Sequence, residues 1–193
     1  MKNILLASSS ITRRALMQRL PIKFESYSPD VDESHIANES RHDLAIRLSK
    51  LKALAGAKQF PGHICIGSDQ VSFIKETKEY LGKPKNKESA ILQLEKASDK
   101  TICFYSGLCM YYKPTEKIYT AMVPTEIKYR KLSREHIERY LEIEQPYHCA
   151  ASLKSEGYGI SICEKISSDD PTAVMGLPLI TLINFLRQEG VPV

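Results

Sequence analysis

The sequence predicts an α/β protein built on a mixed β-sheet that is flanked by helices. Strand-like apolar runs alternate along the chain with amphipathic patterns of helical period, which is typical of layered α/β folds. Two long β-type runs also follow one another with only a turn between them, at residues 101–112 and 118–131. Such neighbours form an antiparallel hairpin, so the sheet is not expected to be purely parallel.

The first part of the chain is expected to contain two strands and two helices. A short apolar strand covers residues 3–7, and a serine-rich turn leads from it into a helix. Residues 22–28 alternate apolar and polar side chains, which predicts a second, half-buried strand. A longer helix starts after Ser40, because Ser40-Arg41-His42-Asp43 has the form of a capping box. Its apolar stripe consists of Leu44, Leu48, Leu51 and Ala55.

The rest of the chain continues the alternation of strands and helices. In chain order we expect a strand at 64–74, a turn at 81–84, a helix at 87–97, the hairpin, a helix capped by Ser133, a polar loop at 149–157, a strand at 159–164, and a helix from Pro178 to Gly190. These elements are enough to build one sheet with helices packed against it.

Composition limits the classes of protein to which the chain can belong. Its 193 residues fit one domain with an extended sheet or two tightly fused lobes. A hydrophobic fraction of 42% with 26% charged residues is ordinary for a globular protein. The net charge of +4 suits a small anionic ligand and is too weak to indicate a stable nucleic-acid partner. The apolar run before the first serine has only four residues, so we expect no signal peptide, no membrane span and a cytoplasmic protein.

Cysteine and histidine usage argues against disulfides, a zinc site and a thiol protease. The five cysteines are irregularly spaced and form no CxxC pair, so we expect reduced thiols, mostly packed in the core: Cys65, Cys103, Cys109, Cys149 and Cys163. The five histidines share no metal-ligand spacing. His148 and Cys149 are adjacent, and neighbouring side chains on an extended chain point to opposite faces, so they cannot pair directly.

The turn after the first strand has the pattern of an anion site. Ser8 and the serines that follow it are small hydrogen-bond donors, and the N–H groups that open the next helix are unpaired within the helix. Arg13 and Arg14 lie in the first turn of that helix, where the dipole disfavours cations unless an anion is bound. We therefore expect a phosphate there. Taken alone, the segment fits an ordinary strand–helix junction with solvated arginines about equally well.

Further ionisable groups lie beside other predicted strands. Asp32 and Glu33 lie in an acidic loop, Asp69 lies inside an apolar strand, and Lys83 lies in the turn beyond it. A charge within an apolar strand is costly unless it is paired or used. Cations that hold phosphate and carboxylates that hold magnesium would form one site at the strand ends. Each residue alone also fits a solvated turn, a backbone cap or plain surface, and Lys52, which borders the apolar stripe, is expected to snorkel outward.

Ordered motifs through nearly the whole chain resemble the Maf family of nucleotide pyrophosphatases. The matching segments are Leu6-Ala7-Ser8-Ser9-Ser10 with Arg13-Arg14, Val31-Asp32-Glu33, Lys52, Gly67-Ser68-Asp69-Gln70, Leu81-Gly82-Lys83-Pro84, Lys154-Ser155-Glu156-Gly157 and Gly176-Leu177-Pro178. The resemblance implies an elongated, often dimeric protein of the inosine-triphosphatase-like fold, with residues 1–193 as a single domain of two lobes around a central cleft. It also implies a house-cleaning hydrolase that releases pyrophosphate from nucleoside triphosphates with a divalent cation, Mg or Mn.

The same resemblance implies a role for each residue of the site. The phosphate-binding set would be Ser8, Arg13, Arg14, Lys52 and Lys83. Glu33 and Asp69 would hold the metal and place the attacking water, with Asp69 as the candidate base. Lys83 would also act in catalysis by holding the charge of the pyrophosphate that leaves.

The segments Asp69-Gln70 and Lys154-Ser155-Glu156-Gly157 resemble the branch of the family that takes 7-methyl-GTP. A carboxylate at Glu156 can accept from the N1–H and the exocyclic amine of guanine, and a cationic methylated base favours it further. Gln70, Lys154 and Thr12 complete the set expected to determine specificity. That branch often has tryptophan at the position of Thr12, whereas this chain has none. Two alternatives remain open: a pyrimidine or other modified nucleotide, of the dTTP or UTP type, and a non-catalytic nucleotide-binding regulator of cell division.

Overall fold

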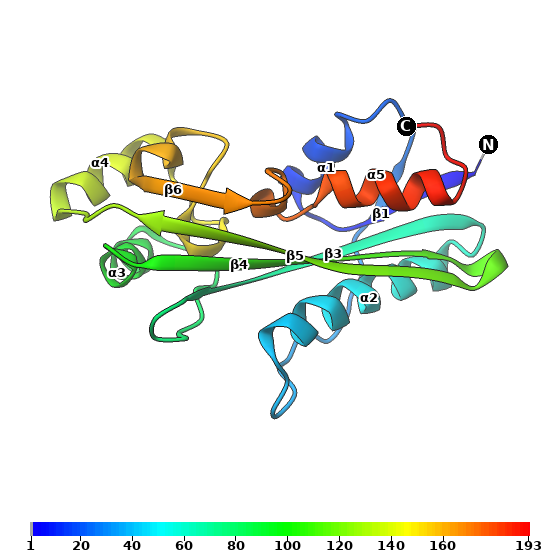
Figure 1. Cartoon of the computed structure of the whole chain (residues 1–193), viewed down its shortest axis with the longest axis horizontal. Coiled ribbons are helices and arrows are strands. Elements are labelled where there is room, and N and C mark those ends of the chain that lie inside the picture. The colour runs from blue at the N-terminus through cyan, green and yellow to red at the C-terminus, as the bar shows by residue number, and fades with distance from the viewer. Residues whose placement is uncertain (1) are drawn as a thin grey trace. The chain divides into compact units, whose positions relative to one another are not determined.

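The computed structural model describes residues 2–193 and contains a six-stranded mixed sheet in the order β2-β1-β3-β4-β5-β6 (Figure 1). The strands are β1 (Asn3–Ala7), β2 (Glu25–Tyr27), β3 (His63–Ile74), β4 (Thr101–Tyr112), β5 (Lys117–Tyr129) and β6 (Cys163–Ser168). β1 is parallel to both β2 and β3, whereas β5 and β6 are antiparallel. This confirms the predicted α/β class and the mixed sheet.

The helices begin and end close to where the sequence predicts. They are α1 (Ile11–Met17), α2 (Arg41–Gln59), α3 (Lys87–Ala97), α4 (Arg134–Glu144) and α5 (Leu179–Gln188). β4 and β5 are neighbours joined by a single 3-10 turn at Lys113–Thr115, which confirms the hairpin.

Two sequence-based strand assignments are wrong in extent. β2 is only three residues long, because it pairs with no more than Leu5–Ala7 of β1. The strand predicted over residues 159–164 begins only at Cys163, and Tyr158–Ile162 form a 3-10 helix instead. A Cβ atom on Gly159 would overlap the carbonyl of Lys154, so the chain folds back tightly there and cannot extend. The local alternation of residues carries no information about that contact.

The chain divides into two compact units, each made from separate stretches of sequence. Unit 1 comprises residues 1–70, 105–123 and 170–193, and unit 2 comprises residues 71–104 and 124–169. β3, β4 and β5 each contribute residues to both units.

Unit 1 has three layers, with helices on both faces of its part of the sheet. On one face, α1 and α5 pack on alternate residues of β1, β3 and β4 in a cluster that includes Leu6, Ile66, Leu108 and Leu182. On the opposite face, Ala57 of α2 packs with Leu5 and Cys65 in a smaller cluster. Figure 1 shows α2 on the other side of β1 and β3 from α1 and α5.

The contact between α2 and the sheet depends on two glycines. A Cβ atom on Gly67 of β3 would overlap the backbone of α2 at Ser49 and Ala53, and one on Gly107 of β4 would overlap the carbonyl of Ala45. The helix therefore lies directly against the strand backbones. This close approach brings Lys52, three residues beyond Ser49, to the stretch of β3 that follows Gly67.

Unit 2 is built around α3, α4 and two 3-10 turns. α3 contacts α4, α4 contacts the turn Tyr158–Ile162, and α3 contacts the turn Ala150–Ser152. Tyr129 and Tyr140 are fully buried, and their hydroxyl groups donate hydrogen bonds to backbone carbonyls, those of Ala151 and Ser152 respectively. These buried tyrosines tie the polar loop to the core of unit 2.

The cysteines agree with the prediction of thiols packed mostly in the core. All five cysteines are free thiols, four of them are buried, and Cys149 is partly exposed. Burial raises the pKa of Cys65 and Cys109 to about 12, so these thiols are protonated and unreactive at neutral pH. Within residues 2–193, every helix is too short or too polar to cross a bilayer.

Candidate active site

Three parallel strands bring the serine turn, the acidic loop and the aspartate strand to one edge of unit 1. Ala7 of β1 pairs with Tyr27 of β2, and Leu6 pairs with Ile66 of β3. Because parallel strands point the same way, the segments that follow Ala7 and Tyr27 start beside the stretch Gly67–Asp69. The carboxyl edge of this sheet is therefore where the predicted phosphate and metal residues of unit 1 gather.

The serine turn is held by its own hydroxyl groups. Ser8 is buried, and its Oγ accepts a hydrogen bond from the backbone N–H of Ser10 at 3.2 Å. Ser10 is the N-cap of α1, and its Oγ accepts from the N–H of Arg13 at 3.3 Å. These two hydrogen bonds hold the turn in shape.

Arg13 turns back toward the sheet and is anchored far along the chain. Its Nε donates to the carbonyl of Gly176 at 2.7 Å, and Nη1 lies 3.5 Å from Ser8 Oγ. Gly176 has a left-handed backbone with φ of 93°, and a Cβ atom there would lie 3.1 Å from Arg13 Nε. Desolvation lowers the pKa of Arg13, and the negative charges of Asp69 and Glu33 act in the opposite direction. Arg13 therefore belongs to the same electrostatic cluster as the two carboxylates.

Lys52 lies between the two carboxylates that the sequence proposes as metal ligands. Its Nζ is 2.5 Å from Asp69 Oδ1 and 2.7 Å from Glu33 Oε1. The side chains of Lys52 and Asp69 are only 11% and 13% exposed, whereas that of Glu33 is 58% exposed. The expectation that Lys52 snorkels outward is wrong, because two carboxylates compensate for the removal of its ammonium group from water.

The acidic loop is fastened to α2 by an ion pair that sequence reasoning missed. Arg47 Nε is 2.5 Å from Glu39 Oε1, and Arg47 Nη2 donates to the carbonyl of Ser34 at 2.9 Å. Glu39 raises the pKa of Arg47, with smaller effects from Asp32 and Asp69. The only signal in the sequence is a basic residue on the same helix as Lys52, within reach of an acidic loop. This ion pair restrains the segment that presents Glu33.

Gln70 is bound within unit 1 by its amide group. Its Nε2 lies 3.0 Å from Ser106 Oγ, 3.0 Å from the carbonyl of Ala173 and 2.8 Å from that of Val174. The N–H groups of the Gln70 amide therefore already donate to other groups of the protein. A contact between Gln70 and a nucleobase stays a prediction, and it would use the carbonyl oxygen.

The structure brings some of the predicted residues together and leaves others at separate places. Ser8, Arg13, Lys52, Glu33 and Asp69 form the cluster in unit 1. Thr12 and Arg14 lie on α1, partly exposed and exposed respectively. Lys83, Lys154 and Glu156 belong to unit 2, so their convergence with this cluster stays a prediction.

The chemistry of the cluster suits a hard divalent cation. Glu33 and Asp69 present carboxylate oxygens to one point, which Lys52 Nζ occupies. Magnesium prefers such oxygens, and it keeps waters or takes substrate phosphate oxygens for its other positions. Across residues 2–193, no group of three or more His, Cys, Asp and Glu side chains is arranged to hold a metal. A divalent cation held by Glu33, Asp69 and phosphate oxygens of a substrate stays a prediction.

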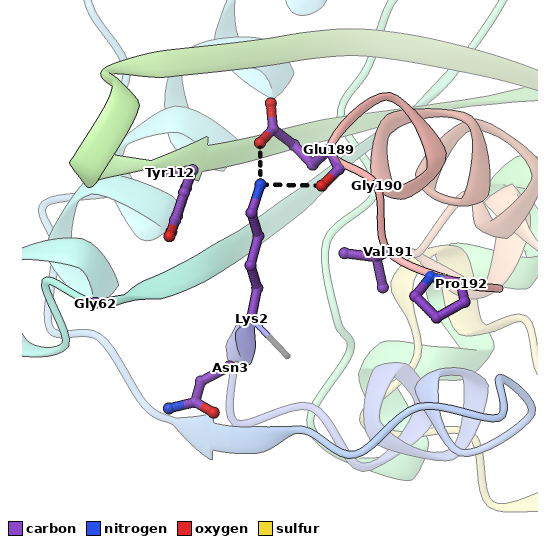
Figure 2. A pocket seen from close by; sticks show the side chains of 8 residues that line it. All are labelled: Lys2, Asn3, Gly62, Tyr112, Glu189, Gly190, Val191 and Pro192. Carbon is purple, nitrogen blue, oxygen red and sulfur yellow. Dashed lines mark hydrogen bonds and ion pairs between the residues drawn. The ribbon is translucent and has the colours of Figure 1, made fainter.

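A separate pocket of about 420 Å³ lies at the opposite end of β1 (Figure 2). Lys2 and Asn3 line it from the start of the strand, and the segment Glu189–Pro192 lines it from beyond α5. Lys2 Nζ lies 2.7 Å from Glu189 Oε2 and 4.6 Å from the centre of the Tyr112 ring. None of the predicted site residues lines this pocket. The ion pair between Lys2 and Glu189 links the start of β1 to the segment that follows α5.

Comparison with known proteins identifies the family. The family model described as "Maf-like protein" matches residues 3–189. The chain belongs to the Maf family. It is similar over its full length to curated proteins from Pseudomonas aeruginosa (45% identity, all of that chain), Colwellia psychrerythraea (42%, 96% of that chain) and Nitrosospira multiformis (43%, 96% of that chain). All three relatives are named 7-methyl-GTP pyrophosphatase.

A solved structure also matches part of the chain. The Ham1 protein of Staphylococcus aureus is 16% identical, with a TM-score of 0.47 over 67% of this chain and 73% of its own.

Proposed function

We propose that this protein is a nucleoside triphosphate pyrophosphatase that hydrolyses 7-methyl-GTP to 7-methyl-GMP and pyrophosphate. The observation that carries the proposal is the buried Lys52, held between Asp69 and Glu33 beside the anchored Arg13 in a chain of the Maf family. The names of the three curated relatives support the same substrate. A house-cleaning role in the cytoplasm, acting on free nucleotides, belongs to this proposal.

The reaction needs a water, a base and a stabilised leaving group. Water attacks the α-phosphorus, the bond from that phosphorus to the bridging oxygen breaks, and pyrophosphate leaves. Asp69 takes the proton from the water, because its carboxylate lies at the carboxyl edge of the sheet and is largely shielded from solvent. Glu33 and Asp69 would hold a divalent cation, Mg or Mn, which supplies charge neutralisation at the phosphates and a more acidic water.

Cationic side chains of unit 1 would hold the triphosphate. Arg13 uses Nε on Gly176 and Nη1 on Ser8, so further N–H groups of its guanidinium are available for phosphate oxygens. The anchoring contacts fix the direction of the guanidinium in advance, which lowers the entropic cost of binding. Lys52 adds a buried positive charge at the same place, and Lys83 of unit 2 would complete the set by holding the pyrophosphate charge.

The base would be recognised by the segment that contains Glu156. The Glu156 side chain is exposed, and its carboxylate can accept from two donors on the guanine edge. The 7-methyl group makes the base cationic, which increases its attraction to a carboxylate. A cationic base gains from stacking on an aromatic side chain, and Thr12 cannot provide one. Pyrimidine nucleotides and other modified nucleotides are therefore the second candidate substrates. A dimeric state and the absence of a stable nucleic-acid partner stay predictions.

A panel of nucleotides with pyrophosphate detection tests the proposal. The panel contains 7-methyl-GTP, GTP, dTTP, UTP and CTP, each with Mg and with Mn. We expect the highest kcat/KM with 7-methyl-GTP. Faster turnover of dTTP or UTP would replace the substrate assignment, and nucleotide binding without pyrophosphate release would favour the non-catalytic regulator.

A further inference from the structure

Glu144, the last residue of α4, contacts both ends of the segment that carries Glu156. Its Oε2 lies 2.6 Å from Lys154 Nζ, and its Oε1 accepts a hydrogen bond from the backbone N–H of Tyr158. The Glu144 side chain is only 8% exposed, so these two contacts lie largely shielded from water. We propose that Glu144 is a positioning residue that fixes the segment Lys154–Tyr158 and thereby sets nucleotide specificity through Glu156.

The backbone of the segment is shaped to receive this carboxylate. A Cβ atom on Gly157 would overlap Glu144 Oε1, so any other residue at position 157 would displace the carboxylate or the loop. Lys154 and the N–H of Tyr158 together lower the pKa of Glu144, and its negative charge is thus kept at the loop. Glu144 therefore lies against the main chain one residue after Glu156.

A second residue of α4 holds the same segment one turn earlier. The hydroxyl of the buried Tyr140 accepts from the N–H of Lys154 at 3.1 Å and donates to the carbonyl of Ser152 at 2.9 Å. Tyr140 and Glu144 are four residues apart and therefore lie on one face of the helix. Tyr140 holds the backbone of Lys154, and Glu144 holds the side chain of Lys154 and the backbone of Tyr158. Glu156 lies between these contacts and is exposed.

This arrangement changes the expected role of Lys154. Its ammonium group is neutralised by Glu144, with smaller support from Glu156. Lys154 therefore acts as the link between α4 and the loop, and direct recognition of the nucleotide falls to Glu156. The inference rests on the proposed function in this one respect, that Glu156 contacts the base.

The test is Glu144→Gln, with Glu142→Gln as the matched control on the same helix. Glu142 is exposed, so its replacement removes one negative charge without touching the loop. For the nucleotide that the wild-type protein prefers in the panel, we expect Glu144→Gln to raise KM about 10-fold while kcat changes less than about 2-fold. Its preference over the next best nucleotide falls by a similar factor. A KM and a preference equal to those of Glu142→Gln would overturn the inference.

Two further measurements separate positioning from a general loss of folding. Lys154→Gln removes the same ion pair and should raise KM as much as Glu144→Gln, and the double variant should be no worse than either single one. Amide hydrogen exchange of residues 154–158 should quicken in Glu144→Gln, while that of β3 and β4 stays unchanged. If the KM increases of Glu144→Gln and Lys154→Gln multiplied in the double variant, the two residues would act independently, which would contradict their shared role in holding the segment. The proposed function fails separately, if the preferred nucleotide of the wild type is not 7-methyl-GTP.

Discussion

Replacement of Glu189 by Gln is predicted to lower the free energy of unfolding at neutral pH. The same replacement should lower it much less in acid. The Glu189 side chain is 2% exposed and accepts from Lys2 at 2.7 Å, Tyr119 at 2.7 Å and Lys117 at 3.3 Å. These contacts, that with Lys2 first, lower the pKa of Glu189 from 4.5 to about 2. The carboxylate is therefore more favourable in the folded chain than in the unfolded one.

The size of the effect follows from this shift in pKa. At about 1.36 kcal/mol per pKa unit, the lowered pKa corresponds to roughly 3 kcal/mol before the exposure of the partners is considered. Lys2 and Lys117 are partly in contact with water, with side chains 34% and 56% exposed, so screening reduces the value to about 2–3 kcal/mol. Because the folded pKa of Glu189 lies below the unfolded one, this stability is complete above about pH 4.5 and is lost as the pH falls toward 2.

Denaturant unfolding of the wild type and Glu189→Gln at pH 7 and pH 3 measures both quantities. At pH 7 we expect the free energy of unfolding to fall by about 2–3 kcal/mol, and the difference should narrow at pH 3. The exposed pair of Lys96 and Glu79 provides the control, since Glu79→Gln should change stability very little. A Glu189→Gln variant as stable as wild type at pH 7, or a difference that grows in acid, would refute the reasoning.

Three further predictions concern the candidate site. Arg13→Lys should raise KM for the preferred nucleotide at least 10-fold, because an ammonium group cannot hold Gly176 and Ser8 and still present a fork of donors to phosphate; an unchanged KM would remove Arg13 from phosphate binding. Lys52→Met should tighten binding of Mn in the absence of nucleotide, measured by electron paramagnetic resonance, because the ammonium no longer competes for the carboxylates; weaker binding of Mn would argue against a metal at Glu33 and Asp69. Glu156→Gln should reduce the preference for 7-methyl-GTP over GTP by about 10-fold, in line with one charge-assisted contact; identical substrate panels would refute its role at the base.

Local signals predicted the parts of the fold that local physics decides. The helix α2 begins where Ser40 was expected to cap it, since Ser40 Oγ accepts from the N–H of Asp43 at 3.1 Å. Ser133 caps α4 in the same way through His136, at 3.2 Å. Both bonds join residues three apart, so the sequence contains all that is needed to foresee them.

Contacts between distant segments account for what the sequence missed. The direction of Lys52 is set by Asp69 and Glu33, and sequence periodicity shows only that Lys52 borders an apolar stripe. The anchoring of Arg13 depends on the carbonyl of Gly176, 163 residues away. A 3-10 turn at Tyr158–Ile162 replaces the start of a predicted strand, where Gly159 lies tightly against the carbonyl of Lys154 and Glu144 accepts from the N–H of Tyr158. In each case a tertiary contact overrides a pattern that is correct locally.

The most direct test of the account is Asp69→Asn, assayed for nucleotide binding and for pyrophosphate release on the same preparation. The substitution keeps the size of the side chain and a hydrogen-bond acceptor for Lys52, but removes the group that takes the proton from water. We expect 7-methyl-GTP to bind with an affinity within about 10-fold of wild type and pyrophosphate release to fall by at least about 1,000-fold. Turnover close to that of the wild type would contradict the assignment of Asp69 as the base and, with it, the proposed active site.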